Sequence, residues 1–481
     1  MHKKSARMSG RIVAWGAAAM LLSSQVFSAA AQDATPVTGA MATPTVLEAG
    51  QFTIERPFLI PAEGANITIT PLLTAGEKVG DYQMAGVPDG LGAYLGEEGA
   101  VVFMNHELSK EGDENLSDSR VSRLVLDPAT GAVLSGSYVV TGTEGYWSLC
   151  SASLAGPEVG FDPPVFLTGE ETAEGPKGGL AMAINAVDGT ITELPWLGHF
   201  SHENQIAVPG FEGKTVVVAT DDDSNGSELY MYIAASPADF LAGKGQLYVF
   251  KADNAAGTAD IAKGTTLTGS FIPVDQANNT DAKTLQDKVW ADGAFRFVRT
   301  EDITYDRNSS NILYFTDTGD NEDPNLAGDG APFTQNGRLY SLTLDPADPT
   351  KVTAFTVLLD GDAGDELRNP DNIDADKSTI MIQEDLNSYN RAENSDAVAR
   401  IWAYSIADGT LTPVALLDQS AGDGLVDAGD KAGSWESSGI LNVSEIFGEG
   451  TWLTDVQAHS ITAPQFGGED ESGQLLIIRP S

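Results

Sequence analysis

The sequence predicts an all-β protein, and within that class a six-bladed β-propeller. Short runs of β-branched and aromatic residues bounded by Gly, Asp, Asn and Pro recur along the chain, whereas helix-period patterns with capping residues are scarce. Six apolar runs end in acidic or metal-competent residues and start about 50 to 95 residues apart, which leaves room for one four-stranded sheet and its loops. A pair of β-sandwiches is the main competing architecture.

The six runs share one layout, an apolar strand that stops abruptly at carboxylates, amides or histidines. They span residues 101–107, 165–171, 216–223, 312–320, 380–385 and 451–459. A single Asp or Asn after a strand is an ordinary turn residue. In a propeller, however, the ends of the inner strands face a common central channel, so we expect acidic residues from distant blades to converge at one end.

The N-terminus has the layout of a secretory signal peptide. Lys3, Lys4, Arg7 and Arg11 surround the start of an apolar run, Ile12–Leu22, that leads to small residues ending at Ala31. We therefore predict a signal peptide over 1–31, a flexible lead-in over 32–50, and a single propeller domain over 51–481. The apolar run is too short to span a membrane. The expected location is secreted or periplasmic.

The net charge and the single cysteine limit which binding partners and crosslinks the protein can have. The chain has 27 Lys and Arg against 69 Asp and Glu, a formal net charge of −42, so nucleic acid and anionic membranes are poor partners. The lone Cys150 excludes an intramolecular disulfide, and we interpret it as a small buried side chain. We expect a monomer.

Oxygen donors are abundant among the potential metal ligands, since the chain has 69 Asp and Glu but a single Cys and five His. Residues 221–226 resemble the first half of an EF-hand loop, but Tyr232 stands where the twelfth-position Glu would be. The stretches 371–376 and 317–323 are weaker versions of the same pattern. Such donors select Ca²⁺ or Mg²⁺ over softer metals. The alternative is a set of solvated turns.

Two short motifs combine a carboxylate with a His or an Arg. They are His202-Glu203 and Arg299-Thr-Glu301-Asp302. Alternation along a strand places Arg299 and Glu301 on the same face, where a cation ligand and a phosphate clamp would point into one site. An ordinary salt bridge would explain the same pair. For His106 beside Glu107, and for His459, we favour structural roles.

Taken in order, several of these motifs resemble those of the PhoX family of secreted bacterial alkaline phosphatases. They are Met104-Asn-His-Glu107, Leu167-Thr-Gly-Glu-Glu171, Gly198-His-Phe-Ser-His-Glu203, residues 221–223, Arg299-Thr-Glu-Asp302 and Asn369-Pro-Asp-Asn372. The resemblance covers about residues 80 to 390. It implies a six-bladed propeller whose channel holds several Ca²⁺ ions and a pair of iron ions, and which cleaves small phosphate monoesters.

The resemblance also assigns roles to individual residues. Arg299 would contact the phosphate, and Glu203 and Glu301 would bind iron. The implied calcium ligands are Glu171, Asp222, Asp302, Asp371 and Asn372. The family's iron-binding Cys is expected just before the acidic pair, where this chain has Gly169, which puts Fe³⁺ in question.

Two alternatives to a phosphatase remain open at this stage. The first is a calcium-stabilised propeller that binds a ligand without catalysis. The second is a calcium-dependent hydrolase of the lactonase type.

Overall fold

Antiparallel strands dominate the computed structural model, which describes residues 44–109, 118–223, 226–319, 334–386, 397–422, 434–462 and 471–481. These residues belong to one compact unit that spans 41–481. The predicted signal peptide and residues 32–43 of the predicted lead-in lie outside the described residues. The all-β prediction is confirmed.

Most of the chain folds as successive four-stranded antiparallel meanders. The first contains β6 (Pro88–Gly96), β7 (Gly99–His106), β8 (Arg120–Leu126) and β9 (Val133–Thr141). The second contains β10 (Leu149–Ala155), β11 (Val165–Glu170), β12 (Ala181–Asn185) and β13 (Ile191–Glu193).

Two further meanders merge into one nine-stranded sheet. One contains β14 (His202–Ala207), β15 (Thr215–Asp221), β16 (Leu229–Ala234) and β17 (Gly245–Ala252), followed by β18 (Thr266–Pro273). The other contains β19 (Thr300–Tyr305), β20 (Ile312–Asp317), β21 (Arg338–Asp345) and β22 (Asp348–Asp360). Pairing of β18 with β22 joins them at their outer edges.

The last two sheets each take an outer strand from the N-terminal part of the chain. One has β23 (Pro370–Ala375), β24 (Thr379–Glu384), β25 (Arg400–Ser405) and β26 (Leu411–Leu417), completed by β2 (Leu59–Pro61). The other has β27 (Glu436–Asn442), β28 (Trp452–Thr462) and β29 (Glu471–Pro480), completed by β3 (Ile67–Thr74). The β29–β3 pairing ties the C-terminal strand to the N-terminal region.

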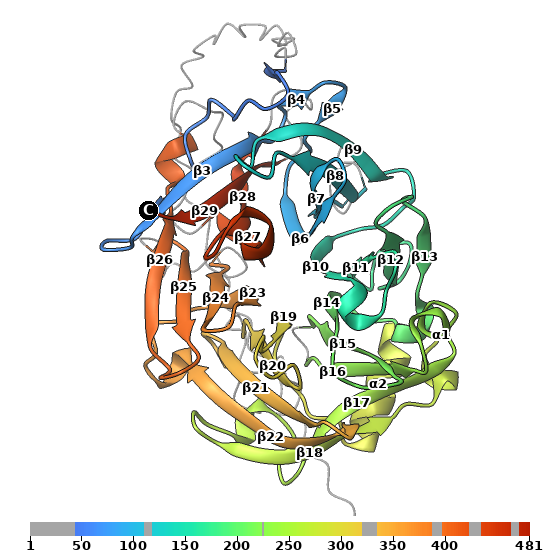
Figure 1. Cartoon of the computed structure of the whole chain (residues 1–481). Coiled ribbons are helices and arrows are strands. Elements are labelled where there is room, and N and C mark those ends of the chain that lie inside the picture. The colour runs from blue at the N-terminus through green and yellow to red at the C-terminus, as the bar shows by residue number, and fades with distance from the viewer. Residues whose placement is uncertain are drawn as a thin grey trace, which may run out of the picture. The chain divides into compact units, whose positions relative to one another are not determined.

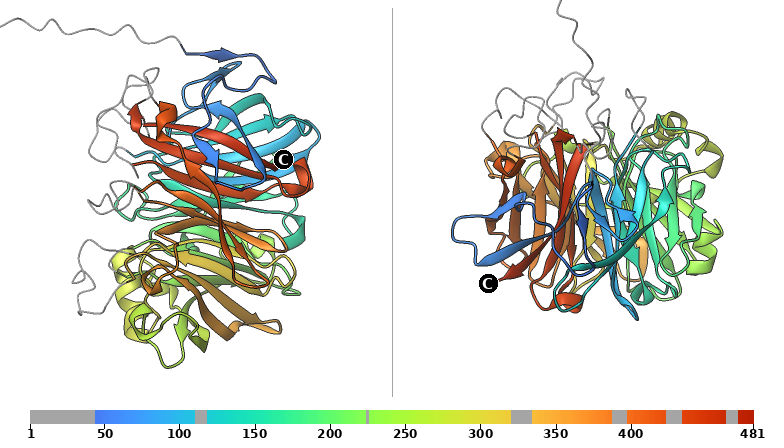
Figure 2. Two further views of the ribbon diagram at one scale, coloured as in Figure 1. Left: turned by 90° about the vertical axis from the view of Figure 1, so that its left-hand side faces the viewer. Right: turned by 90° about the horizontal axis from the view of Figure 1, so that it is seen from above.

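The first strands of the meanders contact one another in a ring. β6 contacts β10, then β10 contacts β14, β14 contacts β19, β19 contacts β23, β23 contacts β27, and β27 contacts β6. Figure 1 shows these strands innermost, with the sheets arranged around them. In the side views of Figure 2 the strands of neighbouring sheets run side by side along the axis of this ring. The arrangement is that of a propeller rather than of two face-to-face sandwiches.

The hydrophobic core is divided among the spaces between successive sheets. One cluster packs Phe103 and Val121 against Phe166 and Met182. Burying each large apolar side chain stabilises the fold by roughly 1.5–3 kcal/mol. The second strands are covered on both faces, and β7, β11 and β15 are buried along their whole length. Because both faces are apolar, these strands appear in sequence as continuous hydrophobic runs.

Smaller elements complete the described residues. β1 (Val46–Leu47), β4 (Lys78–Val79) and β5 (Tyr82–Gln83) form a three-stranded sheet. The helices are α1 (Pro237–Leu241), α2 (Ala282–Asp292) and α3 (Ser444–Phe447). Asp281 caps α2 by accepting a hydrogen bond from the Thr284 amide. Within the described ranges, none of the helices has the length and apolar character needed to span a membrane.

Candidate metal centre

The six apolar runs form the second strands of the meanders rather than the innermost ones, which corrects the placement we expected from sequence. Each second strand is antiparallel to the inner strand beside it, so it ends where that inner strand begins. Glu107, Glu171 and Asp222 are the residues that directly follow β7, β11 and β15. They therefore lie at the same end of the channel as the starts of the inner strands.

The inner strands share one irregularity at this end. In β6, β10, β14, β19 and β23 the pairing register shifts between the first and fourth residues of the strand. Such a bulge bends the strand and re-aims a side chain. The second residues of these strands are Asp89, Cys150, Glu203, Glu301 and Asp371. Five inner strands thus present a carboxylate or thiol from an equivalent position.

The residue before four of these strands has a left-handed backbone. The φ angles are 47° for Val87, 45° for Ser148, 56° for Arg299 and 44° for Asn369. A non-glycine residue in this region is strained, and such strain is concentrated at functional sites. The repeated turn and bulge together position the first side chains of each strand.

Eight residues form what we call the channel-end cluster: Asp89, Glu107, Cys150, Glu171, Glu203, Asp222, Glu301 and Asp371. They make four overlapping groups, each with ligand atoms within 4.8 Å of one another. The groups are Asp89–Glu107–Cys150, Cys150–Glu171–Glu203, Glu171–Asp222–Glu301 and Glu203–Glu301–Asp371. The cluster brings together five of the predicted metal ligands: Glu171, Glu203, Asp222, Glu301 and Asp371.

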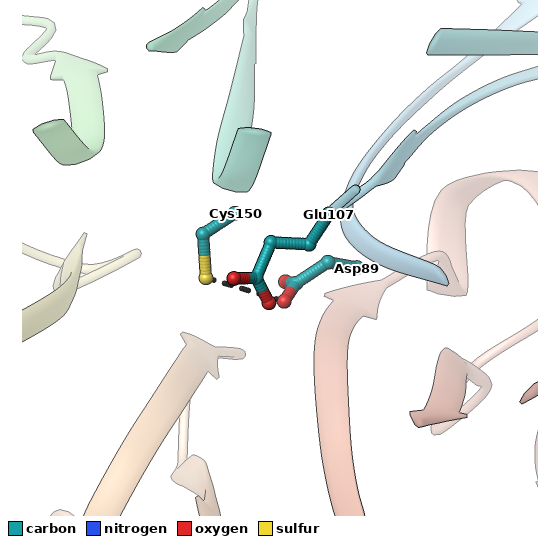
Figure 3. A group of neighbouring side chains, drawn as sticks. All are labelled: Asp89, Glu107 and Cys150. Carbon is teal, nitrogen blue, oxygen red and sulfur yellow. Dashed lines mark hydrogen bonds between the residues drawn. The ribbon is translucent and has the colours of Figure 1, made fainter. Parts of the chain in front are cut away.

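Cys150 connects two of these groups. Its Sγ lies 3.2 Å from Asp89 Oδ2 and 3.6 Å from Glu203 Oε1. Figure 3 shows Asp89, Glu107 and Cys150 pointing toward one another from three separate segments. Cys150 is buried, as expected, but it faces carboxylates rather than apolar side chains. Position 169 has no room for a thiol, because a Cβ there would lie 2.5 Å from His202 Cβ.

Electrostatics in the cluster oppose ionisation. Burial, and then neighbouring negative charge, raise the pKa values of Asp89, Cys150, Glu171, Glu203, Glu301 and Asp371. Among the described residues, Glu203 Oε2 and Asp371 Oδ1 have no hydrogen-bond partner, and Glu301 Oε1 has an ion pair with Arg299 but no hydrogen bond. Bound cations would offset the cost of ionising these buried carboxylates, and they would supply partners for the oxygens that lack hydrogen bonds.

Arg299 brings positive charge to the cluster. Its Nε and Nη2 each lie 2.8 Å from an oxygen of Asp222, and Nη2 lies 3.2 Å from Glu301 Oε1. The predicted pairing of Arg299 with Glu301 is therefore present, with Asp222 as a further partner. A planar guanidinium can bind phosphate through two parallel hydrogen bonds.

Two predicted ligands lie outside the four groups. Asp302 accepts hydrogen bonds from Asn204 Nδ2 and from the main-chain amides of Ile303 and Ile373. Its oxygens are satisfied by protein donors, so its surroundings differ from those expected of a calcium ligand. Asn372 is fully buried beside Asp371, and neither of its amide atoms has a hydrogen-bond partner in the described ranges.

The acidic loops do not each form one site. In 221–226, Asp222 turns to Arg299, Asp223 accepts from Gln286, and residues 224–225 lie outside the described ranges. In 371–376, Asp374 forms an ion pair with Arg307 and does not share a ligand group with Asp371. Most of 317–323 lies outside the described residues.

Three histidines that the sequence singled out hydrogen-bond or ion-pair with protein groups outside the channel-end cluster. His106 bonds Gly86 O at 2.9 Å and Ser122 Oγ at 2.7 Å. His202 bonds Gly198 O and packs on Phe200. His459 pairs with Glu471 at 2.5 Å. None of the three belongs to the channel-end cluster.

Sequence reasoning missed Asp89 and Cys150 and gave Glu107 too little weight. A signal was present in the chain, because each bulge is a four-residue motif with a carboxylate or thiol second. The motifs are Pro88-Asp-Gly-Leu91, Leu149-Cys-Ser-Ala152, His202-Glu-Asn-Gln205, Thr300-Glu-Asp-Ile303 and Pro370-Asp-Asn-Ile373. If these five motifs had been recognised as an internal repeat, Asp89 and Cys150 would have been identified from the sequence.

Fold and cluster together define the class of protein, a propeller-like β-protein with overlapping potential metal sites at one end of its channel. A family model described as "Alkaline phosphatase PhoX" matches residues 165–435, more than half of the chain. The protein belongs to the PhoX alkaline phosphatase family, and the resemblance seen in the sequence is confirmed. Among curated proteins, none matches the sequence significantly.

A solved structure of a PhoX protein shares the fold. Pseudomonas fluorescens PhoX in complex with vanadate, a transition state analogue, superposes with a TM-score of 0.65 at 15% identity, covering 90% of this chain and 97% of that chain. The soluble aldose sugar dehydrogenase of Escherichia coli has a TM-score of 0.38 at 11% identity and covers 86% and 100%. The GH43_1 enzyme of Xanthomonas citri has 0.32 at 10% and covers 85% and 90%. The last two are too dissimilar to inform function.

Proposed function

We propose that this protein is a metal-dependent phosphatase that hydrolyses small phosphate monoesters at the channel-end cluster. The observation that supports this most directly is the overlap of four ligand groups, two of which include Glu301 beside Arg299, in a member of a phosphatase family. An acidic protein can hold a phosphate only where cations locally reverse its field.

The donor types suggest two kinds of metal. Glu171–Asp222–Glu301 and Glu203–Glu301–Asp371 offer carboxylate oxygens, which suit Ca²⁺. The two groups with Cys150 add a thiol, which suits a transition metal such as iron and loses its proton on coordination. Because Cys150 supplies that thiol, Gly169 is no longer a reason to doubt iron. We further propose Asn372 Oδ1 as an additional oxygen ligand.

Several steps of the reaction would depend on residues of this chain. The bound cations would supply the positive charge that stabilises a phosphoryl group and the charge it develops. The bulges hold the carboxylates in place before substrate arrives, which lowers the reorganisation needed during reaction. Arg299, held by Asp222 and Glu301, would share its N–H groups with phosphate oxygens and orient the ester.

We also propose that the sheets count as six blades in one domain. Six first strands contact in sequence around the ring, and a hydrophobic cluster lies between each pair of successive sheets. In this interpretation the nine-stranded sheet comprises two blades, with β18 as an added edge strand. Export by the signal peptide would place the enzyme, as a monomer, in the medium or periplasm, and N-terminal sequencing of the mature protein would test cleavage after Ala31.

The decisive experiment combines elemental analysis of the purified protein with a p-nitrophenyl phosphate assay at alkaline pH, with and without Ca²⁺. We expect calcium, a second transition metal, and turnover. Arg299→Ala should lose turnover about 100-fold or more while keeping its fold and metals. Arg307→Ala is a matched control, because Arg307 pairs with Asp374 outside the cluster.

Other outcomes would redirect the assignment. Calcium without turnover of any phosphoester would favour a binding propeller. Cleavage of lactones without phosphatase activity would favour a lactonase-type hydrolase. Full activity in Arg299→Ala would remove the role assigned to that residue.

A further inference from the structure

A carboxylate on the closing sheet is buried without any hydrogen bond that the described residues supply. Asp455, on β28, is fully buried, and neither of its carboxylate oxygens has a partner there. Its charged neighbours are Asp89 and Glu436, which are also acidic, and burial followed by these charges raises the pKa of Asp455. Asp455 belongs to none of the four groups of the channel-end cluster.

The two oxygens of Asp455 share a small space with a main-chain oxygen of β6. A Cβ atom placed on Gly439 would lie 2.8 Å from Asp455 Oδ2, 3.0 Å from Asp455 Oδ1 and 2.9 Å from Asp89 O. Gly439 lies on β27 with φ 46°, where a side chain is disfavoured. The glycine therefore leaves open a space that three oxygens surround.

A fourth oxygen is available on the same face of β28. Gln457 lies two residues beyond Asp455, so both side chains project to one side of the strand. Gln457 Nε2 donates to Asp89 Oδ2 at 2.8 Å and to Glu107 Oε2 at 3.2 Å, while its Oε1 is buried without a partner among the described residues. The amide is thus oriented by the cluster with its carbonyl oxygen unused.

All four of these atoms are hydrogen-bond acceptors. A single water molecule has only two hydrogens to donate, whereas a cation can satisfy several oxygens at once. Ca²⁺ accepts carboxylate, main-chain carbonyl and amide oxygens together and completes its coordination with water. Two carboxylates nearby, Asp89 and Glu436, add attraction for a positive ion.

We propose that Asp455 and the main-chain oxygen of Asp89, with Gln457 Oε1, bind a calcium ion that fastens β6 to β28 beside Gly439 of β27. These are the strands at which the ring closes, since β27 contacts β6 and joins the last sheet to the first. Asp455 belongs to none of the four groups, and Asp89 contributes its main-chain oxygen rather than its carboxylate, so we assign the ion a structural role. The competing explanation is a protonated Asp455 that donates a hydrogen bond to Asp89 O.

Asp455→Asn separates these explanations, because asparagine reproduces the neutral acid but has one oxygen fewer and no charge. Calcium content by mass spectrometry and melting temperature in Ca²⁺ and in EDTA should be measured on the full mature protein. We expect one calcium ion fewer per chain, a smaller Ca²⁺-dependent rise in melting temperature, and loss of Ca²⁺-dependent hydrogen-exchange protection in β6 and β28. A wild-type calcium count with an unchanged calcium-dependent shift would overturn the proposal.

Glu384→Gln is the matched control. Glu384 is also a buried carboxylate on a second strand, β24, but its oxygens accept hydrogen bonds from Trp402 Nε1 and from the main-chain amides of Arg368 and Arg400. This variant should melt lower by the same amount in Ca²⁺ and in EDTA, with its calcium count unchanged.

Gly439→Ala tests the same site from its opposite side. The new Cβ would occupy the space between the oxygens, so one calcium ion should again be lost, and a full count in a folded variant would contradict the proposal. The readouts are binding and stability, so they hold whether or not the protein hydrolyses phosphate esters. A failure of the phosphatase assignment and a failure of this site are therefore distinguishable.

Discussion

Two sets of buried carboxylates lie on the same or neighbouring strands and have opposite surroundings. In the channel-end cluster, Glu203, Glu301 and Asp371 each have an oxygen without a hydrogen-bond partner among the described residues. In a second set, Asp302, Asp374 and Glu384, donors from the protein surround the carboxylates. Asp374, for example, accepts from Thr304, Arg307 and the amides of Ala375 and Asn442. Glu301 and Asp302 are adjacent in sequence yet fall into different sets.

The difference teaches how to recognise a metal ligand in a chain rich in acids. A buried carboxylate costs free energy unless it is paired or hydrogen-bonded. Where main-chain amides and side chains supply the donors, the carboxylate ties strands together and needs no ion. Where only other carboxylates and one Arg are near, a cation is the remaining means of compensation.

The largest expected effect follows from Glu301→Gln, which alters a residue common to two ligand groups. With metals present, turnover of p-nitrophenyl phosphate should fall about 100-fold or more, because charge stabilisation at the reacting group is lost. In EDTA the same variant should melt higher than wild type, because Gln removes a carboxyl whose ionisation is opposed by burial and by neighbouring carboxylates. Unchanged turnover and metal content would place Glu301 with the hydrogen-bonded set.

A smaller effect, on stability alone, is expected for Asp302→Asn. The amide NH₂ would face the main-chain N–H of Ile303 or of Ile373, both of which now donate to Asp302. Denaturant unfolding should show a loss of about 1–3 kcal/mol, with calcium content retained. If one calcium ion were lost instead, Asp302 would be a ligand, as the family resemblance implied.

The most gradual effect, spread over more than two pH units, concerns the pH dependence of stability. Burial raises the pKa of Glu384 to about 7, against opposing hydrogen bonds from Trp402 and the amides of Arg368 and Arg400. The folded protein therefore keeps a proton that the unfolded chain loses above about pH 4.5, so this group makes stability fall as pH rises from about 4.5 to 7.

Glu384→Gln cannot titrate, so its stability should fall less steeply over that window, by on the order of 3 kcal/mol in total. Unfolding should be followed at several pH values with Ca²⁺ saturating, so that the cluster stays ionised. A slope equal to that of wild type would mean that Glu384 titrates normally in the folded state.

Much of the fold could be predicted because strand patterns are local. The second strands are buried on both faces, so they stand out in sequence as apolar runs, and their spacing suggested the meanders. Glu107, Glu171 and Asp222 follow such runs directly, which is why the ends of the runs pointed to the site. Their assignment to the innermost strands was wrong, since no local pattern states which strand of a sheet lies nearest the channel.

The sequence by itself determined the strand content, the excess of oxygen donors and the family, because these depend on residue types and their order. The tertiary structure alone decided that Cys150 faces Asp89 and Glu203, that Glu301 and Asp302 have different partners, and that Asp455 lies beside the main chain of β6. The physical reason is that bulges break the simple alternation of a strand, and ring closure brings together residues hundreds of positions apart. Both effects arise from pairing between strands, which a single segment of sequence does not contain.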